Sequence, residues 1–198
     1  LESYSLNSLW KLSSKNKLEF QNLHNFLWLV SLDIKTNKTS AQTIIENWID
    51  NNHDFNEETW KLDILSKRLI AWISNSNLTL SESDLKYKEK FILSITKQTN
   101  HLSQNIDSLQ DDENKLICCS SLILVGLAFK NQYKNCELGL SYLQKIIKNN
   151  FDVSGFPKSR NPEELIICLK YFILTKEWIK ESQNQIPNYL EEIIFNCG

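Results

Sequence analysis

The chain has 198 residues, of which 41% are hydrophobic, and its formal net charge at pH 7 is -2. This length is enough to bury one sizeable core, so we expect a single helical domain over residues 1–198. The small negative charge does not favour a nucleic-acid partner, and no apolar run approaches the ~20 residues that span a bilayer. The chain holds only 4 glycines and 3 prolines, which excludes the turn-rich composition of an all-β fold.

Methionine is absent from the whole sequence, including position 1. Because translation starts with Met, this absence predicts that the chain is a fragment of a longer protein. The apolar run Ile193-Ile194-Phe195, three residues before the last position, predicts that the longer protein continues beyond it.

Apolar residues recur every three or four positions along nearly the whole chain, which predicts about eight α-helices. In the first half, the expected helices cover residues 19–33, a segment that is capped by Thr39 or Ser40, residues 58–75, and a segment from Ser81 to about Asn105. Short polar connections between helices favour antiparallel helical hairpins.

The second half begins with the most apolar segment of the chain. Residues 113–130 are apolar on all sides, so we expect this helix to be the most buried. The remaining helices are expected over residues 138–147, from the Asn161 cap and Pro162 to about Lys180, and after Pro187. Hairpins packed in series are typical of a solenoid or of a closed α/α toroid.

The five cysteines do not predict a disulfide framework, because their number is odd and their spacing is irregular. They are Cys118, Cys119, Cys136, Cys168 and Cys197. Small buried apolar side chains are the simplest interpretation, and free thiols favour the cytoplasm. The three histidines show no metal-ligand spacing to these cysteines, so we expect no metal site. The sequence has no Gly-rich phosphate loop, and we expect no cofactor.

Only two arginines occur, and both have positions that indicate more than a surface charge. Arg68 lies within the apolar stripe from Leu65 to Trp72, where it forms either a structural contact or a ligand contact. Arg160 precedes the expected helix cap Asn161, and a helix N-terminus with a guanidinium beside it favours an anion. The alternative is that Asn161 only caps the helix and Arg160 is only a surface charge.

The six tryptophans fall mostly within apolar stripes, which favours positions in the core. The alternative is that an aromatic face such as that of Trp60 stacks on a sugar ring.

Several segments, in their order along residues 20 to 195, resemble the N-terminal helical region of heparinase II/III-like proteins. They are Phe26-Leu27-Trp28-Leu29-Val30-Ser31-Leu32, Trp48-Ile49, Trp60, Arg68, Trp72, Ser121-Leu122-Ile123-Leu124-Val125-Gly126-Leu127-Ala128-Phe129 and Ser159-Arg160-Asn161-Pro162-Glu163. The resemblance implies an incomplete α/α toroid, which in longer relatives precedes a C-terminal β-sandwich domain. Such relatives cleave acidic polysaccharides, for example heparan sulfate or alginate, by β-elimination.

The resemblance also locates the positions at which this family carries its chemistry. The Asn-His pair with which the family neutralises a uronate carboxylate falls on Glu113-Asn114, and the catalytic Tyr falls on Glu164. A carboxylate at position 113 would repel a uronate, whereas Asn114 could donate a hydrogen bond if the register slips by one. The catalytic residues therefore stay unknown, and the expected substrate-binding residues are Arg160, Asn161, Arg68, Asn114 and Trp60.

Three functions remain open at this point. The chain could be the helical domain of a polysaccharide lyase, a lyase-like domain that binds an acidic polysaccharide without cleaving it, or a helical scaffold with no sugar ligand. The expected partners are an acidic polysaccharide or oligosaccharide and the β-sandwich domain of the same protein. The resemblance implies a location in the periplasm or cell envelope, whereas the free thiols favour the cytoplasm. We expect no lyase activity from the fragment alone.

Overall fold

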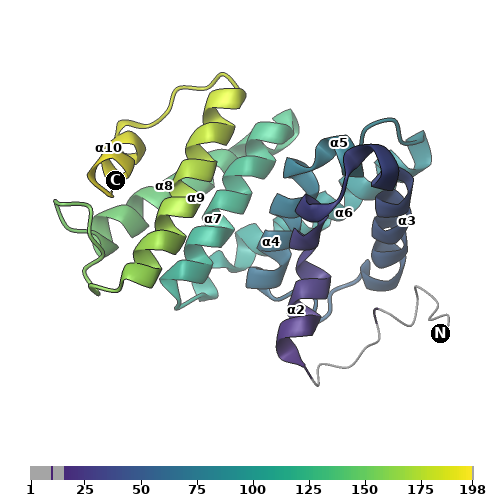
Figure 1. Ribbon diagram of the computed structural model, residues 1–198, viewed down its shortest axis with the longest axis horizontal. Helices are drawn as coiled ribbons and strands as arrows, with labels where there is room; N and C mark the ends of the chain where they lie inside the picture. Colours follow the sequence, from purple (N-terminus) through teal and green to yellow (C-terminus); the bar gives the residue numbers. More distant parts are fainter. Residues whose placement is uncertain (1–9, 11–15, 198) are drawn as a thin grey trace. The chain divides into compact units, whose positions relative to one another are not determined.

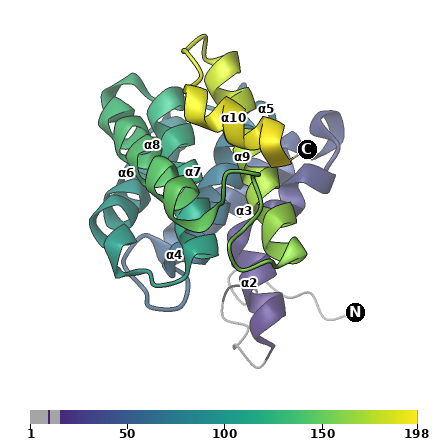
Figure 2. The same cartoon turned by 90° about the vertical axis from the view of Figure 1, so that its left-hand side faces the viewer.

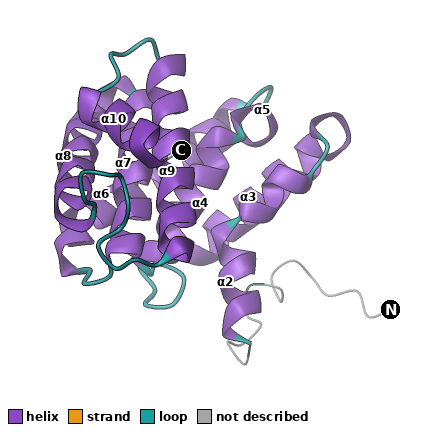
Figure 3. Ribbon diagram, turned by 60° about the vertical axis from the view of Figure 1, so that its left-hand side comes forward, coloured by secondary structure: helices purple, strands orange, loops and turns teal. Residues whose placement is uncertain are grey.

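The computed structural model describes residue 10 and residues 16–197. In this part the chain forms nine α-helices, with short 3-10 helices at Leu27–Ser31, Ile106–Ser108 and Lys130–Gln132 and with no strand (Figure 3). The helices are α2 (Lys17–Asn25), α3 (Ile34–Asn52), α4 (Leu62–Ser74), α5 (Ser76–Thr79), α6 (Leu85–Asn105), α7 (Asp112–Ala128), α8 (Tyr133–Asn150), α9 (Pro162–Glu181) and α10 (Asn188–Cys197). The prediction of an all-α fold is therefore confirmed.

The chain divides into two compact units, Leu1–His101 and Leu102–Gly198, and the boundary falls inside α6. The single domain over residues 1–198 stays a prediction. None of the described helices is both long and apolar enough to cross a membrane.

In the first unit, the expected helix over residues 19–33 is wrong, because the chain breaks it at Phe26. Phe26 adopts a left-handed backbone conformation with φ 59°, which ends α2, and a 3-10 helix follows. The side chain of Asn25 accepts a hydrogen bond from the backbone N–H of Leu27 at 2.9 Å, which fixes the turn. This break places the Phe26 side chain in the core, fully buried. Tertiary packing therefore overrides the helical periodicity of the segment.

Two helix starts also differ from the expected ones. The backbone N–H of Asn37 already bonds to the carbonyl of Asp33, so α3 begins before Thr39 and Ser40, and neither residue caps it. The cap of α6 is Asp84 rather than Ser81, because the Asp84 carboxylate accepts from the backbone N–H of Tyr87 at 2.8 Å. Several Ser, Thr, Asn and Asp residues precede each helix, so composition alone does not choose among them.

The core of the first unit is aromatic. Phe26 contacts Trp48 and Trp72 edge to face, and the two tryptophans contact each other in the same manner, with ring centroids 5.4–5.9 Å apart. Phe91 of α6 stacks on Trp72 at 5.3 Å. Rings in these orientations pack with favourable electrostatics in addition to their buried area.

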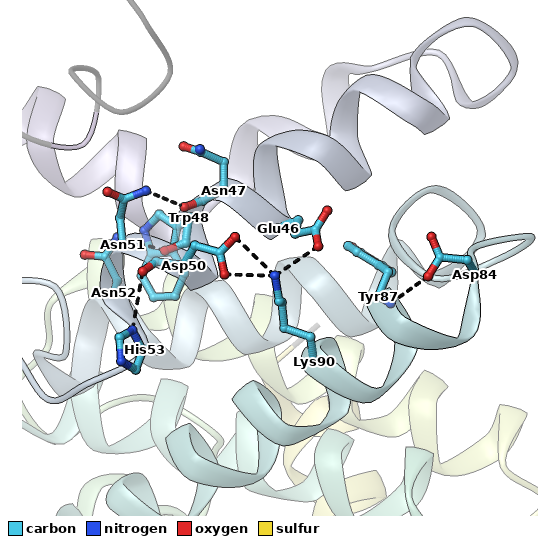
Figure 4. Close-up of polar contacts among 10 residues, drawn as sticks. All are labelled: Glu46, Asn47, Trp48, Asp50, Asn51, Asn52, His53, Asp84, Tyr87 and Lys90. Atoms are coloured by element: carbon cyan, nitrogen blue, oxygen red, sulfur yellow. Dashed lines mark hydrogen bonds and ion pairs between the residues drawn. The ribbon is translucent and has the colours of Figure 1, made fainter.

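An ion cluster joins α3 to α6 at the surface of the same unit (Figure 4). The ammonium group of Lys90 lies between two carboxylates, 2.9 Å from Glu46 and 2.8 Å from Asp50. Glu46 and Asp50 are four residues apart, so both lie on the face of α3 that is turned to Lys90. These hydrogen bonds raise the pKa of Lys90, which therefore stays charged and acts as a link between helices.

The second unit is built around α7. Every residue from Leu116 to Gly126 is buried, as the sequence predicted for an all-round apolar helix. Figures 1 and 2 both show α7, α8 and α9 side by side. A Cβ atom on Gly126 would lie 2.4 Å from the backbone nitrogen of Cys136, and one on Gly139 would lie 2.6 Å from the carbonyl of Cys119. The close packing of α7 against α8 therefore requires glycine at both positions.

Candidate functional site

Arg68 lies inside the first unit, and its side chain is fully buried. Its guanidinium donates to the amide oxygen of Gln98 at 2.7 Å and to the carbonyls of His24 and Thr59 at 2.9 and 3.0 Å. The Trp48 ring lies 4.1 Å from the guanidinium carbon, which adds a cation–π contact. These contacts make Arg68 a structural residue of the first unit, and its contact with a sugar stays a prediction.

Trp60 also belongs to the core of the first unit, with an exposed fraction of 6%. Its indole N–H donates to the carbonyl of Asn52 at 3.1 Å, and its ring meets His101 edge to face at 5.6 Å. Its face is therefore covered by protein, and stacking on a sugar stays a prediction.

The other expected site residues all lie in the second unit, at the end where α7 and α9 begin. Asn161 caps α9 as predicted, because its side chain accepts from the backbone N–H of Glu163 at 3.0 Å and Pro162 follows it. Asn114 lies in the first turn of α7, where its amide donates to the Asp111 carboxylate at 2.7 Å. Asp111 is the cap of α7.

Arg160 occupies the turn that leads into α9. Its backbone is left-handed, with φ 60°, and its side chain is exposed. The guanidinium forms an ion pair with Asp152 at 2.9 Å and lies 5.9 Å from the ring centre of Phe156. Hydrogen bonds from Ser154 hold the pKa of Asp152 below its usual range, and the Arg160 charge contributes to this. Asp152 is therefore ionised, and its carboxylate already occupies one of the hydrogen-bond donors of the Arg160 guanidinium.

A pocket with a volume of about 320 Å³ opens between the first turns of α7 and α9, and we call it the carboxylate pocket. Its lining residues are Asp111, Asp112, Glu113, Asn161, Glu163, Glu164 and Ile167. Acidic residues in the first turn stabilise a helix through its dipole. Burial raises the pKa of the neighbouring Cys168 thiol to about 12, and the charges of Glu164 and Glu113 add to this shift. Glu113 and Glu164, the two positions at which the family resemblance places an Asn and a Tyr, therefore lie in one pocket, and both are acidic.

A second pocket of about 220 Å³ lies on the other side of the α7 start, and we call it the Tyr142 pocket. It is lined by Asp107, Asp112, Lys115, Tyr142, Lys145, Ile146, Asn149 and Asn150. Burial and a hydrogen bond to Asp107 raise the pKa of Tyr142 to about 12, so the phenol stays protonated at neutral pH. The ammonium group of Lys145 lies 5.2 Å from the ring centre of Tyr142.

The chemistry of the two pockets differs. Five carboxylates line the carboxylate pocket, which therefore repels a uronate or a sulfate. The Tyr142 pocket combines an aromatic ring, two ammonium groups, two carboxylates and two amides, which are groups that hydrogen-bond a hydroxylated ligand. Lys115, Tyr142 and Lys145 were not among the site residues predicted from the sequence. The spacing of Tyr142, Lys145 and Asn149 on one helix face was a signal that could have identified them.

No group of three or more His, Cys, Asp or Glu side chains that could hold a metal ion occurs among the described residues. The carboxylates of the carboxylate pocket are therefore not arranged as a metal centre. The thiols of Cys118, Cys119, Cys136 and Cys168 are free and buried, and Cys197 is free and partly exposed.

No protein-family model matches the sequence, and no curated protein sequence matches it. Among solved structures, the chain is similar to the crystal structure of heparan sulfate lyase HepC from Pedobacter heparinus, with a TM-score of 0.69 and 15% sequence identity. The match covers 100% of this chain and 32% of that protein. The described part of the chain therefore shares its helical fold with a part of that heparan sulfate lyase, as expected from the resemblance to the heparinase II/III-like proteins.

Proposed function

We propose that this chain is a lyase-like helical domain that binds an acidic, uronate-containing polysaccharide without cleaving it. The observation that carries the proposal is the likeness in fold to a heparan sulfate lyase over the full chain, combined with glutamates at two positions where the family places its Asn and its Tyr.

β-Elimination needs a group that neutralises the uronate carboxylate, a base for the C5 proton, and a donor for the leaving oxygen. Glu113 adds negative charge where the carboxylate would need a hydrogen-bond donor. Glu164 can act as a base, but when ionised it has no proton to give to the leaving oxygen. The carboxylate pocket therefore supports neither the first nor the third task.

For binding, the Tyr142 pocket is the better candidate. Lys115 and Lys145 can pair with a carboxylate or sulfate, and the protonated phenol of Tyr142 and the amides of Asn149 and Asn150 can bond sugar hydroxyls. Arg160 would add a further contact at the same end of the second unit, whereas Asn161 lies in the carboxylate pocket and caps α9.

Calorimetric titration with uronate-containing oligosaccharides at low salt tests the proposal. Lys145→Ala should weaken binding by about tenfold, because a charge-assisted hydrogen bond contributes roughly 1.5 kcal/mol. Lys134→Ala is the matched control, since Lys134 is an exposed lysine at the opposite end of α8 and should leave the affinity within about twofold. Equal affinities for wild type and Lys145→Ala would remove the Tyr142 pocket from the binding site.

An ultraviolet assay tests the absence of cleavage, because β-elimination creates an unsaturated uronate that absorbs in that range. We expect no growth of absorbance with heparan sulfate or alginate, and steady growth would contradict the proposal.

The acidic carboxylate pocket favours one alternative, a helical scaffold without a sugar ligand. A folded chain that binds none of these oligosaccharides would decide in favour of the scaffold.

A further inference from the structure

The neighbourhood of Arg68 contains an excess of hydrogen-bond donors over acceptors. Five buried side-chain atoms lack a hydrogen-bond partner within the described part of the chain, namely His24 Nε2, Thr59 Oγ1, Arg68 Nη2, Trp72 Nε1 and Ser121 Oγ. The first four belong to the first unit. Buried polar atoms are almost always hydrogen-bonded in native proteins, so a group of them in one place requires an explanation.

One of these atoms belongs to Arg68 itself, and two belong to residues that contact its guanidinium through their backbone carbonyls. Arg68 donates through Nη1 to the carbonyls of both His24 and Thr59, so these two residues lie against the charged end of its side chain. The exposed fractions of His24, Thr59 and Arg68 are 0%, 5% and 0%. The nearby Trp48 donates to Nδ1 of His24 at 3.0 Å, which leaves the proton of the neutral imidazole on Nε2.

All three unpaired atoms can thus donate a hydrogen bond, and the charge beside them is not balanced. Within the described part of the chain, no carboxylate pairs with Arg68, whose partners are one amide oxygen, two carbonyls and the face of Trp48. A buried charge is costly unless a counter-charge accompanies it. A water molecule would accept these hydrogen bonds but would leave the charge unbalanced, whereas an anion would satisfy both requirements.

A small surface pocket of the first unit lies one helical turn from His24 and from Arg68. It has a volume of about 180 Å³ and is lined by Lys17, Phe20, Gln21, Glu58, Lys61 and Ile64. Phe20 and Ile64 lie one helical turn before His24 and Arg68, and the Phe20 ring contacts that of His24 at a centroid distance of 4.3 Å. The pocket therefore adjoins the cluster, and its two lysines outweigh its one glutamate.

We propose that Arg68, Thr59 and His24 form a binding site for a small monovalent anion of the size of chloride. Arg68 Nη2 supplies the charge, and Thr59 Oγ1 and His24 Nε2 supply two further donors. The site belongs to the first unit and is independent of polysaccharide binding in the second unit.

Bromide, which can replace chloride and scatters X-rays anomalously, is the probe in the crystal. The expected result is an anomalous peak in contact with Arg68 Nη2 and Thr59 Oγ1. An ordinary water peak at that place would overturn the proposal, as would bromide bound only to surface lysines, which would be an adventitious ion only.

Chloride-35 NMR relaxation measures the affinity for chloride in solution. If chloride occupies a specific site, the protein broadens the chloride-35 line, and added bromide reverses this broadening. Thr59→Val keeps the branched shape and removes one donor, so chloride should bind about tenfold more weakly. Ser121→Ala is the matched control, because Ser121 Oγ is also buried and unpaired but lies in the second unit. It should bind chloride as the wild type does. Circular dichroism checks that both variants are folded, and equal affinities for the wild type and Thr59→Val would refute the site.

Discussion

The two arginines of this chain look alike in the sequence but lie in opposite environments. Arg68 is fully buried in the first unit, where carbonyls, an amide and an indole ring surround it. Arg160 lies in an exposed turn of the second unit and pairs with one carboxylate. An isolated arginine in a lysine-rich chain therefore indicates a position where a guanidinium is needed, but it does not indicate whether the guanidinium contacts the protein or a ligand.

The largest effect that separates the two environments is on stability. Arg68→Ala removes one donor group from three buried acceptors, so the free energy of unfolding should fall by about 4 kcal/mol. Arg160→Ala removes an exposed ion pair and should change it by less than about 0.5 kcal/mol. Urea unfolding followed by tryptophan fluorescence measures both. A loss below about 1 kcal/mol for Arg68→Ala would abolish the distinction between the two arginines.

The pH dependence of stability provides a second test, because a histidine adjoins Arg68. Burial, helped by the Arg68 charge, lowers the pKa of His24 from 6.5 to about 4. The unfolded chain therefore takes up the proton first as the pH falls. The preference of the folded state for neutral His24 contributes about 3 kcal/mol to the free energy of unfolding. This contribution is fully present above pH 6.5 and is lost as the pH falls from 6.5 to 4.

His24→Gln should remove this acid-side loss, since glutamine can still accept from the Trp48 indole N–H but does not titrate. His53→Gln is the control, because His53 is exposed, and it should keep the wild-type profile. Urea midpoints from pH 7 to pH 4 give the comparison. Parallel profiles for the wild type and His24→Gln would show that the pKa of His24 is not lowered in the folded chain.

The smallest expected effect concerns the backbone at Arg160. A residue with a side chain is strained at φ 60°, whereas glycine is not. Arg160→Gly should therefore be more stable than Arg160→Ala by about 1 kcal/mol, although both lack the ion pair with Asp152. Thermal unfolding of the two variants measures the difference. If alanine were as stable as glycine, the turn would not hold the left-handed conformation in solution.

Much of the helical architecture could be predicted from the sequence, because the spacing of apolar residues records which face of each helix is buried. The apolar α7 and the Asn161-Pro162 start of α9 are examples, and both depend on interactions within one or two turns. The break at Phe26 could not be predicted in this way. Its cause is the aromatic cluster with Trp48 and Trp72, whose members come from distant parts of the chain.

For the candidate site, the residue types that are available can be read from the sequence, including glutamate at positions 113 and 164. Helix packing brings these two glutamates into one pocket with three other carboxylates, and it places two lysines in the same pocket as Tyr142. The burial of Arg68 was also decided at this level. Local spacing determines the faces of single helices, whereas a pocket or a buried charge arises where the faces of separate helices meet.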